Sequence, residues 1–280
     1  MANLNPLKLS KRYLGGRILA LSTVLALVPL SHRAANVFAA TEQPAATPRT
    51  RILVFIDRSG SVHYDVNKVA QILFQEVDRL RQNGDELGVA FIHEHTEANA
   101  QRLRLEAPLP AKYEESGGST QKRMLMEQQG KLIAQRQEMK TRLRGMLAEA
   151  ANPATARSTD VWGSLSTIST YFSGSSAAER NLVFYVSDMV ESMPGAGRRD
   201  FELHPPADDA SALQAMARAD VPRLRKWYDV TASKPLQTID QVQVLFPLSG
   251  TKKTQNNAMS RYWTVMFGQL GLGPSQVQFQ

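Results

Sequence analysis

The stretch from Arg51 to Val62 constrains the fold more than any other part of the chain. Five apolar residues run without interruption from Ile52 to Ile56, and Asp57 follows them directly. A strand that is apolar on both sides fits the interior of a parallel sheet, which helices cover on both faces. In open α/β sheets, ligands bind at the carboxyl ends of such strands. We therefore expect a binding site immediately after this strand.

The rest of the chain alternates apolar strands with amphipathic helices. Helices are predicted over residues 66–82, 121–151, 161–172, 210–228 and 256–270. Further strands are predicted over residues 86–93, 101–107, 182–186 and 241–246. The segment 101–107 alternates apolar and charged residues, which is typical of an antiparallel edge strand with one wet face. This order predicts a doubly wound α/β fold with a mostly parallel sheet, one antiparallel edge strand and helices on both faces.

The charge of the chain is concentrated at its amino terminus. Residues 1–40 hold five of the 33 basic residues and no acidic residue, which leaves 28 basic and 26 acidic residues in the remainder. Nucleic-acid binding requires a clustered basic face, which a nearly neutral net charge does not predict, so no nucleic-acid partner is expected. The absence of cysteine excludes disulfides, thiol catalysis and thiolate metal sites.

The first 40 residues have the pattern of a targeting segment. Four basic residues precede the apolar run Ile18–Leu30, whose 13 residues are too few for an ordinary spanning helix. The small residues around Phe38 and Ala39 fit a cleavage site. We therefore interpret 1–40 as a signal peptide or, if it is not removed, as a membrane anchor. Either reading predicts an exported protein that is periplasmic, attached to the cell envelope or secreted.

The polar residues after the first strand have a spacing suited to a metal ion. Asp57, Ser59 and Ser61 alternate with Arg58 and Gly60, and a tight turn can bring their oxygen atoms to one point. Mg²⁺ prefers oxygen ligands and keeps several waters, so a few protein oxygens suffice. The alternative is a turn in which the same side chains cap the following helix.

This arrangement resembles the metal-ion-dependent adhesion site of the von Willebrand factor A-type (integrin I-like) domains. That motif also has a Thr on a later loop and an Asp after a later strand, which Thr159 and Asp188 match in order. Ser158 is the alternative hydroxyl for the first of these positions. Where the family often has glycines before its Thr, this chain has Ala156-Arg157-Ser158.

The resemblance implies a division of the chain and a mode of binding. It implies a von Willebrand A-like domain over residues 51–272 with a long helical insertion around 121–151, a linker at 41–50 and a tail at 273–280. It also implies that Asp57, Ser59, Ser61, Thr159 and Asp188 hold Mg²⁺, with Mn²⁺ or Ca²⁺ as alternatives. A Glu or Asp of a protein ligand would complete the metal's coordination, and a membrane contact would involve the uncleaved amino-terminal segment alone. In the family, metal binding can be coupled to movement of the last helix, here the one around Trp263.

Other readings of the sequence lead to different functions. The long helix and the loop 193–209 could make contacts in a metal-independent scaffold of the cell envelope. A haloacid-dehalogenase-type phosphatase would need a second Asp at position 59, and a serine nucleophile would need a G-x-S-x-G elbow, so we expect no enzymatic activity. His93-Glu94-His95 lacks an evident third zinc ligand. Glu191 is expected in solvent, and the three tryptophans are expected as core or capping residues.

Overall fold

The computed structural model describes residues 48–96, 100–106, 118–152, 156–176, 178–228, 230, 235–245 and 253–280. The predicted targeting segment 1–40 and most of the linker 41–50 lie outside these residues. Among the helices that are described, none is both long enough and apolar enough to cross a membrane.

Six strands of the described chain form one sheet in the order β3-β2-β1-β4-β5-β6. Their bounds are β1 (Thr50–Asp57), β2 (Glu86–Ile92), β3 (Gln101–Arg104), β4 (Arg180–Val186), β5 (Gln241–Leu245) and β6 (Val277–Phe279). All neighbours pair in parallel except β3, which is antiparallel to β2 at one edge. Every residue of β1 is buried, as its position between β2 and β4 requires.

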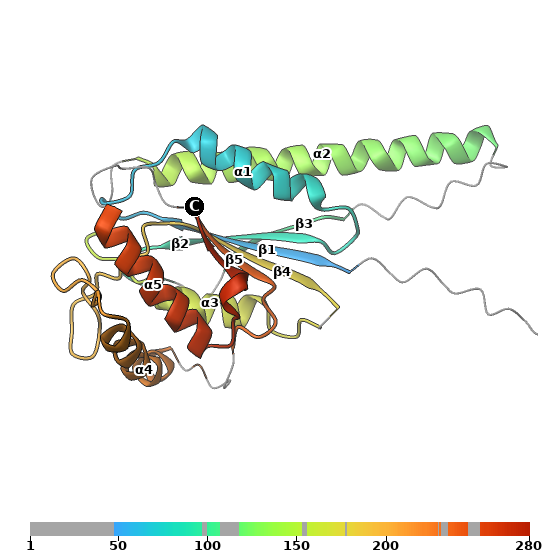
Figure 1. Ribbon diagram of the computed structural model, residues 1–280. Coiled ribbons are helices and arrows are strands. Elements are labelled where there is room, and N and C mark those ends of the chain that lie inside the picture. The colour runs from blue at the N-terminus through green and yellow to red at the C-terminus, as the bar shows by residue number, and fades with distance from the viewer. Residues whose placement is uncertain are drawn as a thin grey trace, which may run out of the picture. The chain divides into compact units, whose positions relative to one another are not determined.

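Helices cover both faces of the sheet (Figure 1). Those on one face are α1 (Val66–Arg79) and α2 (Ser119–Ala150), and those on the other are α3 (Gly163–Tyr171), α4 (Ala210–Trp227) and α5 (Lys253–Gln269). Two hydrophobic cores lie between these layers and the sheet. The alternating residues of β1 divide between the cores: Leu53 and Phe55 enter one, and Ile52, Val54 and Ile56 enter the other. The predicted doubly wound fold is therefore confirmed.

The end of the chain differs from the prediction. Residues 273–280, predicted to be a tail, contain a short 3₁₀ helix, η1 (Pro274–Gln276), and strand β6, which pairs with β5. Val277 and Phe279 are partly buried against the core of α3, α4 and α5. Three alternating residues after a Gly-Pro turn are too few for periodicity to indicate a strand, so this element follows from tertiary packing.

Helix α2 packs on the domain through its carboxyl half. Its buried residues are Met139, Leu143, Leu147 and Ala150. The amino half extends past the sheet (Figure 1), without a break at Gly130, and exposes Met124, Met126 and Ile133. The domain therefore covers this helix over about half of its length.

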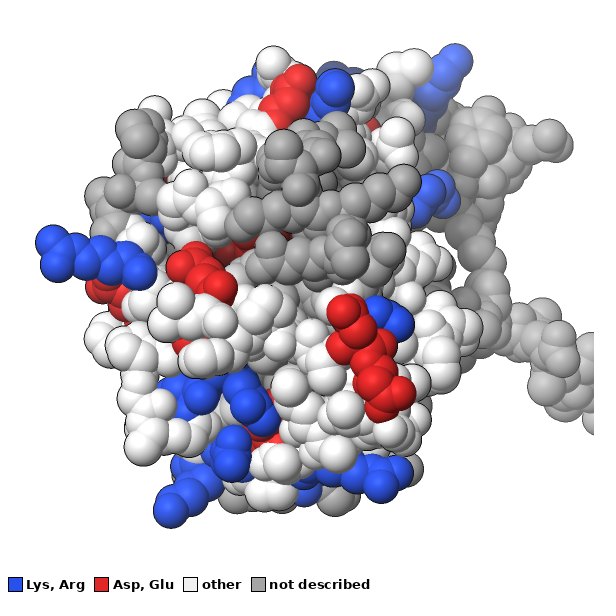
Figure 2. All heavy atoms as spheres, turned by 60° about the vertical axis from the view of Figure 1, so that its left-hand side comes forward, with Lys and Arg blue, Asp and Glu red and all other residues white. Residues whose placement is uncertain are grey.

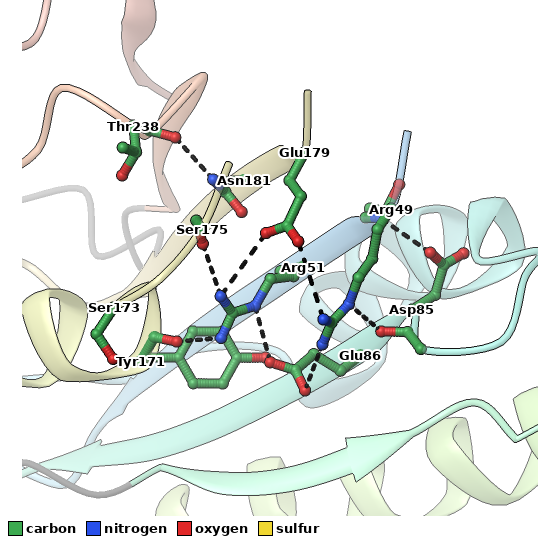
Figure 3. Close-up of polar contacts among 12 residues, drawn as sticks. Arg49, Arg51, Asp85, Glu86, Tyr171, Ser173, Ser175, Glu179, Asn181 and Thr238 are labelled. Carbon is green, nitrogen blue, oxygen red and sulfur yellow. Dashed lines mark hydrogen bonds and ion pairs between the residues drawn. The ribbon is translucent and has the colours of Figure 1, made fainter. Parts of the chain in front are cut away.

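A cluster of arginines surrounds Glu86 near the amino ends of the strands (Figure 3). The Glu86 carboxylate is fully buried and accepts hydrogen bonds from the Nε atoms of Arg51 and Arg104, both at 2.9 Å. Arg49 and Arg102 form longer ion pairs with it, at 3.3 and 3.8 Å. Burial alone would raise the pKa of Glu86, but the surrounding guanidinium groups hold it below its ordinary value.

The cluster makes Glu86 a strong determinant of stability. We expect Glu86→Gln to lower the free energy of unfolding by about 3–5 kcal/mol, because the buried Arg51 loses its counter-charge. Glu179→Gln is the matched control: Glu179 is partly exposed and its ion pairs with Arg49 and Arg51 are 3.9 and 3.8 Å long. Its loss should be below about 1 kcal/mol. Urea unfolding of both variants measures the difference, and equal losses would contradict this account.

Candidate functional site

Asp57 lies at the carboxyl end of the central strand β1, where the sequence places the centre of the site. Its side chain is buried, and Oδ1 accepts a hydrogen bond of 2.8 Å from the backbone N–H of Ser59. Oδ2 accepts one of 2.6 Å from the hydroxyl of Ser187, the first residue after β4. Because β1 and β4 are parallel neighbours, their carboxyl ends bring these two segments together. Ser187 was not among the predicted site residues.

The two predicted hydroxyl ligands lie side by side on the loop after β1. The Oγ atoms of Ser59 and Ser61 are 3.2 Å apart. A turn closed by a 3.3 Å hydrogen bond from the Val62 N–H to the Ser59 carbonyl shapes this loop. Asp65, four residues beyond Ser61, caps α1 by accepting hydrogen bonds from Asn67 and Lys68. Asp65 is thus the residue that caps α1, and the side chains of Ser59 and Ser61 do not serve as the cap.

Asp188 follows Ser187 and lies close enough to Asp57 for their charges to repel each other. The next residue, Met189, is a buried non-glycine residue with a positive φ of 59°, a conformation that bulky side chains rarely adopt. Its carbonyl accepts a 2.8 Å hydrogen bond from the indole Nε1 of Trp263 on α5. Helix α5 therefore holds the backbone next to Asp188 in a strained conformation.

The loop that carries Thr159 lies beside the other predicted residues. A parallel bridge joins Ser59 to Ala156, and Thr159 exchanges two backbone hydrogen bonds, of 3.1 and 2.9 Å, with Ser192. The Thr159 side chain is buried. The structure thus brings Asp57, Ser59 and Ser61 together, with Asp188 close to Asp57, and the bridge from Ser59 to Ala156 joins this group to the loop that carries Thr159. The role of the Thr159 hydroxyl as a ligand stays a prediction.

A buried ion-pair network adjoins this site, and sequence reasoning missed it. Glu191, expected in solvent, is fully buried, accepts a 2.9 Å hydrogen bond from the Trp162 N–H and pairs with Arg198. Arg198 also pairs with Asp160 at 2.7 Å, and Asp160 accepts a hydrogen bond from the Tyr228 hydroxyl. A Glu in a stretch with Gly, Pro and Arg gives no periodic signal of burial, so the expectation was wrong.

This network holds the segment that leads into the first turn of α3. Asp160 Oδ1 accepts a 2.9 Å hydrogen bond from the Gly163 N–H, and a Cβ at Gly163 would lie 2.6 Å from the other oxygen of that carboxylate. Glu94, which lies between His93 and His95, holds the same loop, because its Oε1 accepts a 2.8 Å hydrogen bond from the Arg157 N–H. Within the described residues, no group of three or more His, Asp or Glu side chains could hold a metal.

Two buried carboxylates near the carboxyl ends of β1 and β4, those of Asp57 and Glu191, have raised pKa values. Burial raises the pKa of Asp57 to about 7, and the nearby charge of Asp188 adds to this effect, against the hydrogen bonds from Ser187 and Ser59. Burial also raises the pKa of Glu191 to about 8, although Arg198 opposes the shift. A buried carboxylate next to a second carboxylate is destabilised unless a proton or a cation neutralises it.

Comparisons with known proteins identify no relatives at the level of sequence. No family model matches the chain, and no curated protein matches it. Among solved structures, the pilus adhesin SpaC from Lactobacillus rhamnosus GG matches with a TM-score of 0.43 and 12% identity over 85% of this chain and 28% of its own. Proximal thread matrix protein 1 from the mussel byssus matches with a TM-score of 0.37 and 14% identity over 83% of this chain and 44% of its own. The chain therefore spans less than half of either protein, and similarities at these TM-scores assign neither a family nor a function.

The raised pKa of Asp57 predicts a pH-dependent stability. As the pH rises from about 4 to 7, the unfolded chain releases the Asp57 proton while the folded chain retains it, so the free energy of unfolding falls. Asp57→Asn removes this loss. In EDTA, the variant should gain stability relative to the parent by on the order of 3 kcal/mol across that window. Urea unfolding at pH 4 and pH 8 measures the gain. A difference between the two chains that does not vary with pH would contradict it.

Proposed function

We propose that this chain is an exported von Willebrand A-like module that binds a protein ligand through a divalent cation, for which Mg²⁺ is the first candidate. The observation that carries the proposal is the buried Asp57 carboxylate at the carboxyl end of β1, with Asp188 close to it and two hydroxyls 3.2 Å apart on the adjoining loop. A cation between the carboxylates would remove their repulsion.

The chemistry of the donor set fits a hard cation. Carboxylate and hydroxyl oxygens are the ligands that Mg²⁺ prefers, and it keeps water at the remaining positions. Asp57 and Asp188 would supply the negative charge, while Ser59, Ser61 and Thr159 would supply neutral oxygens. Asp188 is half-buried, so the cation would face the surface next to it. A carboxylate of the protein ligand could then replace a metal-bound water.

Helix α5 could respond to this binding through its contact with the site. The Trp263 indole donates to the carbonyl of Met189, the residue after Asp188. A change in the position of Asp188 would act on the strained backbone that this hydrogen bond holds. This contact supports the coupling between metal and last helix that the family resemblance implies.

The other functions considered from the sequence have less support. Ser59 and Ser61 have no histidine among their hydrogen-bond partners in the described part of the chain, as a base-activated nucleophile requires. One observation favours the metal-independent scaffold: the amino half of α2 exposes Met126 and Ile133, which are seven residues apart and so lie on one helix face where another protein could pack.

Metal binding is tested by thermal unfolding with and without Mg²⁺. At a Mg²⁺ concentration of about 100 times Kd, the parent chain should gain ~2–3 kcal/mol of stability. Asp57→Asn and Asp188→Asn should lose most of this gain. Asp65→Asn is the matched control, because Asp65 follows the same loop but caps α1, where Asn serves equally well. A parent chain whose unfolding does not respond to Mg²⁺, Mn²⁺ or Ca²⁺ would end the proposal.

The partner is tested by capture on immobilised residues 41–280. Proteins that are retained in Mg²⁺ should be released by EDTA and should not bind to Asp57→Ala. A partner that stays bound in EDTA and binds Asp57→Ala equally well would instead support the scaffold. The double substitution Met126→Gln and Ile133→Gln on α2 would then weaken binding.

A further inference from the structure

A hollow lies on the surface of the domain, at the carboxyl end of α4. It is lined by Ala196, Gly197, Arg223, Lys226 and Trp227 and has a volume of about 470 Å³. This volume lies in the range of binding pockets for small ligands and peptide side chains. None of these residues belongs to the predicted metal site.

Trp227 forms an open aromatic surface in this hollow. Trp227, the last residue of α4, is 56% exposed, whereas Trp162 and Trp263 are fully buried, so Trp227 is not a core residue. A large exposed aromatic side chain next to a hollow is a common feature of protein contact surfaces. Exposure of this indole to water is costly and would be relieved by an apolar group packed against it.

The Trp227 indole packs against the Arg198 guanidinium. The Arg198 guanidinium lies 5.6 Å from the Trp227 ring centroid, and the ion pairs of Arg198 with Asp160 and Glu191 fix it in turn. Gly197, with a φ of 83°, leaves the edge of the indole open: a Cβ there would lie 3.7 Å from Nε1. The aromatic surface is therefore formed before any ligand arrives, which lowers the entropic cost of binding.

The charged residues around the hollow are both positive. Arg223 and Lys226 line it, and no acidic residue is among the described lining residues. Arg223 forms an ion pair of 3.5 Å with Asp220. Asp220 also forms a closer ion pair with Arg199 and accepts a hydrogen bond from Tyr262, so it neutralises Arg223 only in part. Lys226 has no ion-pair partner within the described chain. Lys and Arg side chains also gather in the lower part of the face shown in Figure 2, at the height of α4 in Figure 1.

We propose that this hollow binds an acidic peptide segment of a partner protein, with an apolar side chain packed on Trp227 and carboxylates facing Arg223 and Lys226. The complementary charges select an anionic ligand, and the indole selects one that carries an apolar group beside its charge. A peptide fits better than a nucleic acid, because two cations and one aromatic ring are fewer than a phosphate backbone and stacked bases require. The interaction needs no metal.

The test uses the fluorescence of Trp227. Because the other two tryptophans are buried, acrylamide quenches mainly this one. A blocked peptide of alternating glutamate and leucine should protect it from acrylamide in a saturable way, in Mg²⁺ and in EDTA alike. A peptide of alternating glutamine and leucine should not protect Trp227, and neither should a peptide of alternating lysine and leucine. The combined substitution Arg223→Gln and Lys226→Gln should weaken the binding of the glutamate peptide by roughly tenfold.

Matched variants keep the result interpretable. Lys122→Gln with Arg123→Gln removes the same charge from the exposed amino half of α2 and should change the affinity by less than about twofold. Because Trp227→Phe removes the fluorescent group, binding to this variant is measured by the fluorescence polarisation of a labelled peptide. Circular dichroism checks that the variant folds. The proposal is overturned if the glutamine peptide binds equally well, if the basic variant binds as the parent does, or if oligothymidylate binds more tightly. Binding that requires Mg²⁺ would also overturn it, but would place the peptide at the metal site and so support the proposed function.

Discussion

Burial of β1 on both faces is the constraint on which the rest of the structure depends. Its residues alternate between two cores, so each face needs its own layer of helices. With β2 and β4 on either side, the strand has no free edge, and the carboxylate at its end is held between neighbouring loops. Burial of the apolar side chains in the two cores thus stabilises a fold in which the Asp57 carboxylate is also buried, although burial of a carboxylate is by itself unfavourable.

The sequence predicts most of this framework, because the physical signals involved are local. Uninterrupted apolar runs identify β1 and β4, alternation identifies β3 as an edge, and the D-x-S-x-S spacing locates Asp57, Ser59 and Ser61 on one loop. Strand β6 could not be predicted, since a three-residue strand is stabilised by its neighbours in the sheet.

The contacts between loops could not be predicted either, because they depend on residues far apart in the chain. Ser187 reaches Asp57 across 130 positions, and Tyr228 reaches Asp160 across 68. Arg198 is the common element of the second region: it pairs with two carboxylates and lies against the rings of Trp162, Trp227 and Tyr228. A single guanidinium therefore organises the loop before α3, the segment after β4 and the end of α4.

Helix α2 has a mechanical consequence. About twenty residues, 119–138, precede its first buried residue, and at 1.5 Å per residue they span about 30 Å. Leu132 already packs against the core, so about thirteen of these residues, 119–131, extend beyond that contact and would hold a molecule attached to the tip about 20 Å from it. Leu143 and Leu147 anchor the helix in the core, and the Tyr64 hydroxyl, which donates a hydrogen bond to the Leu147 carbonyl, joins this part of the helix to the segment just after Ser61.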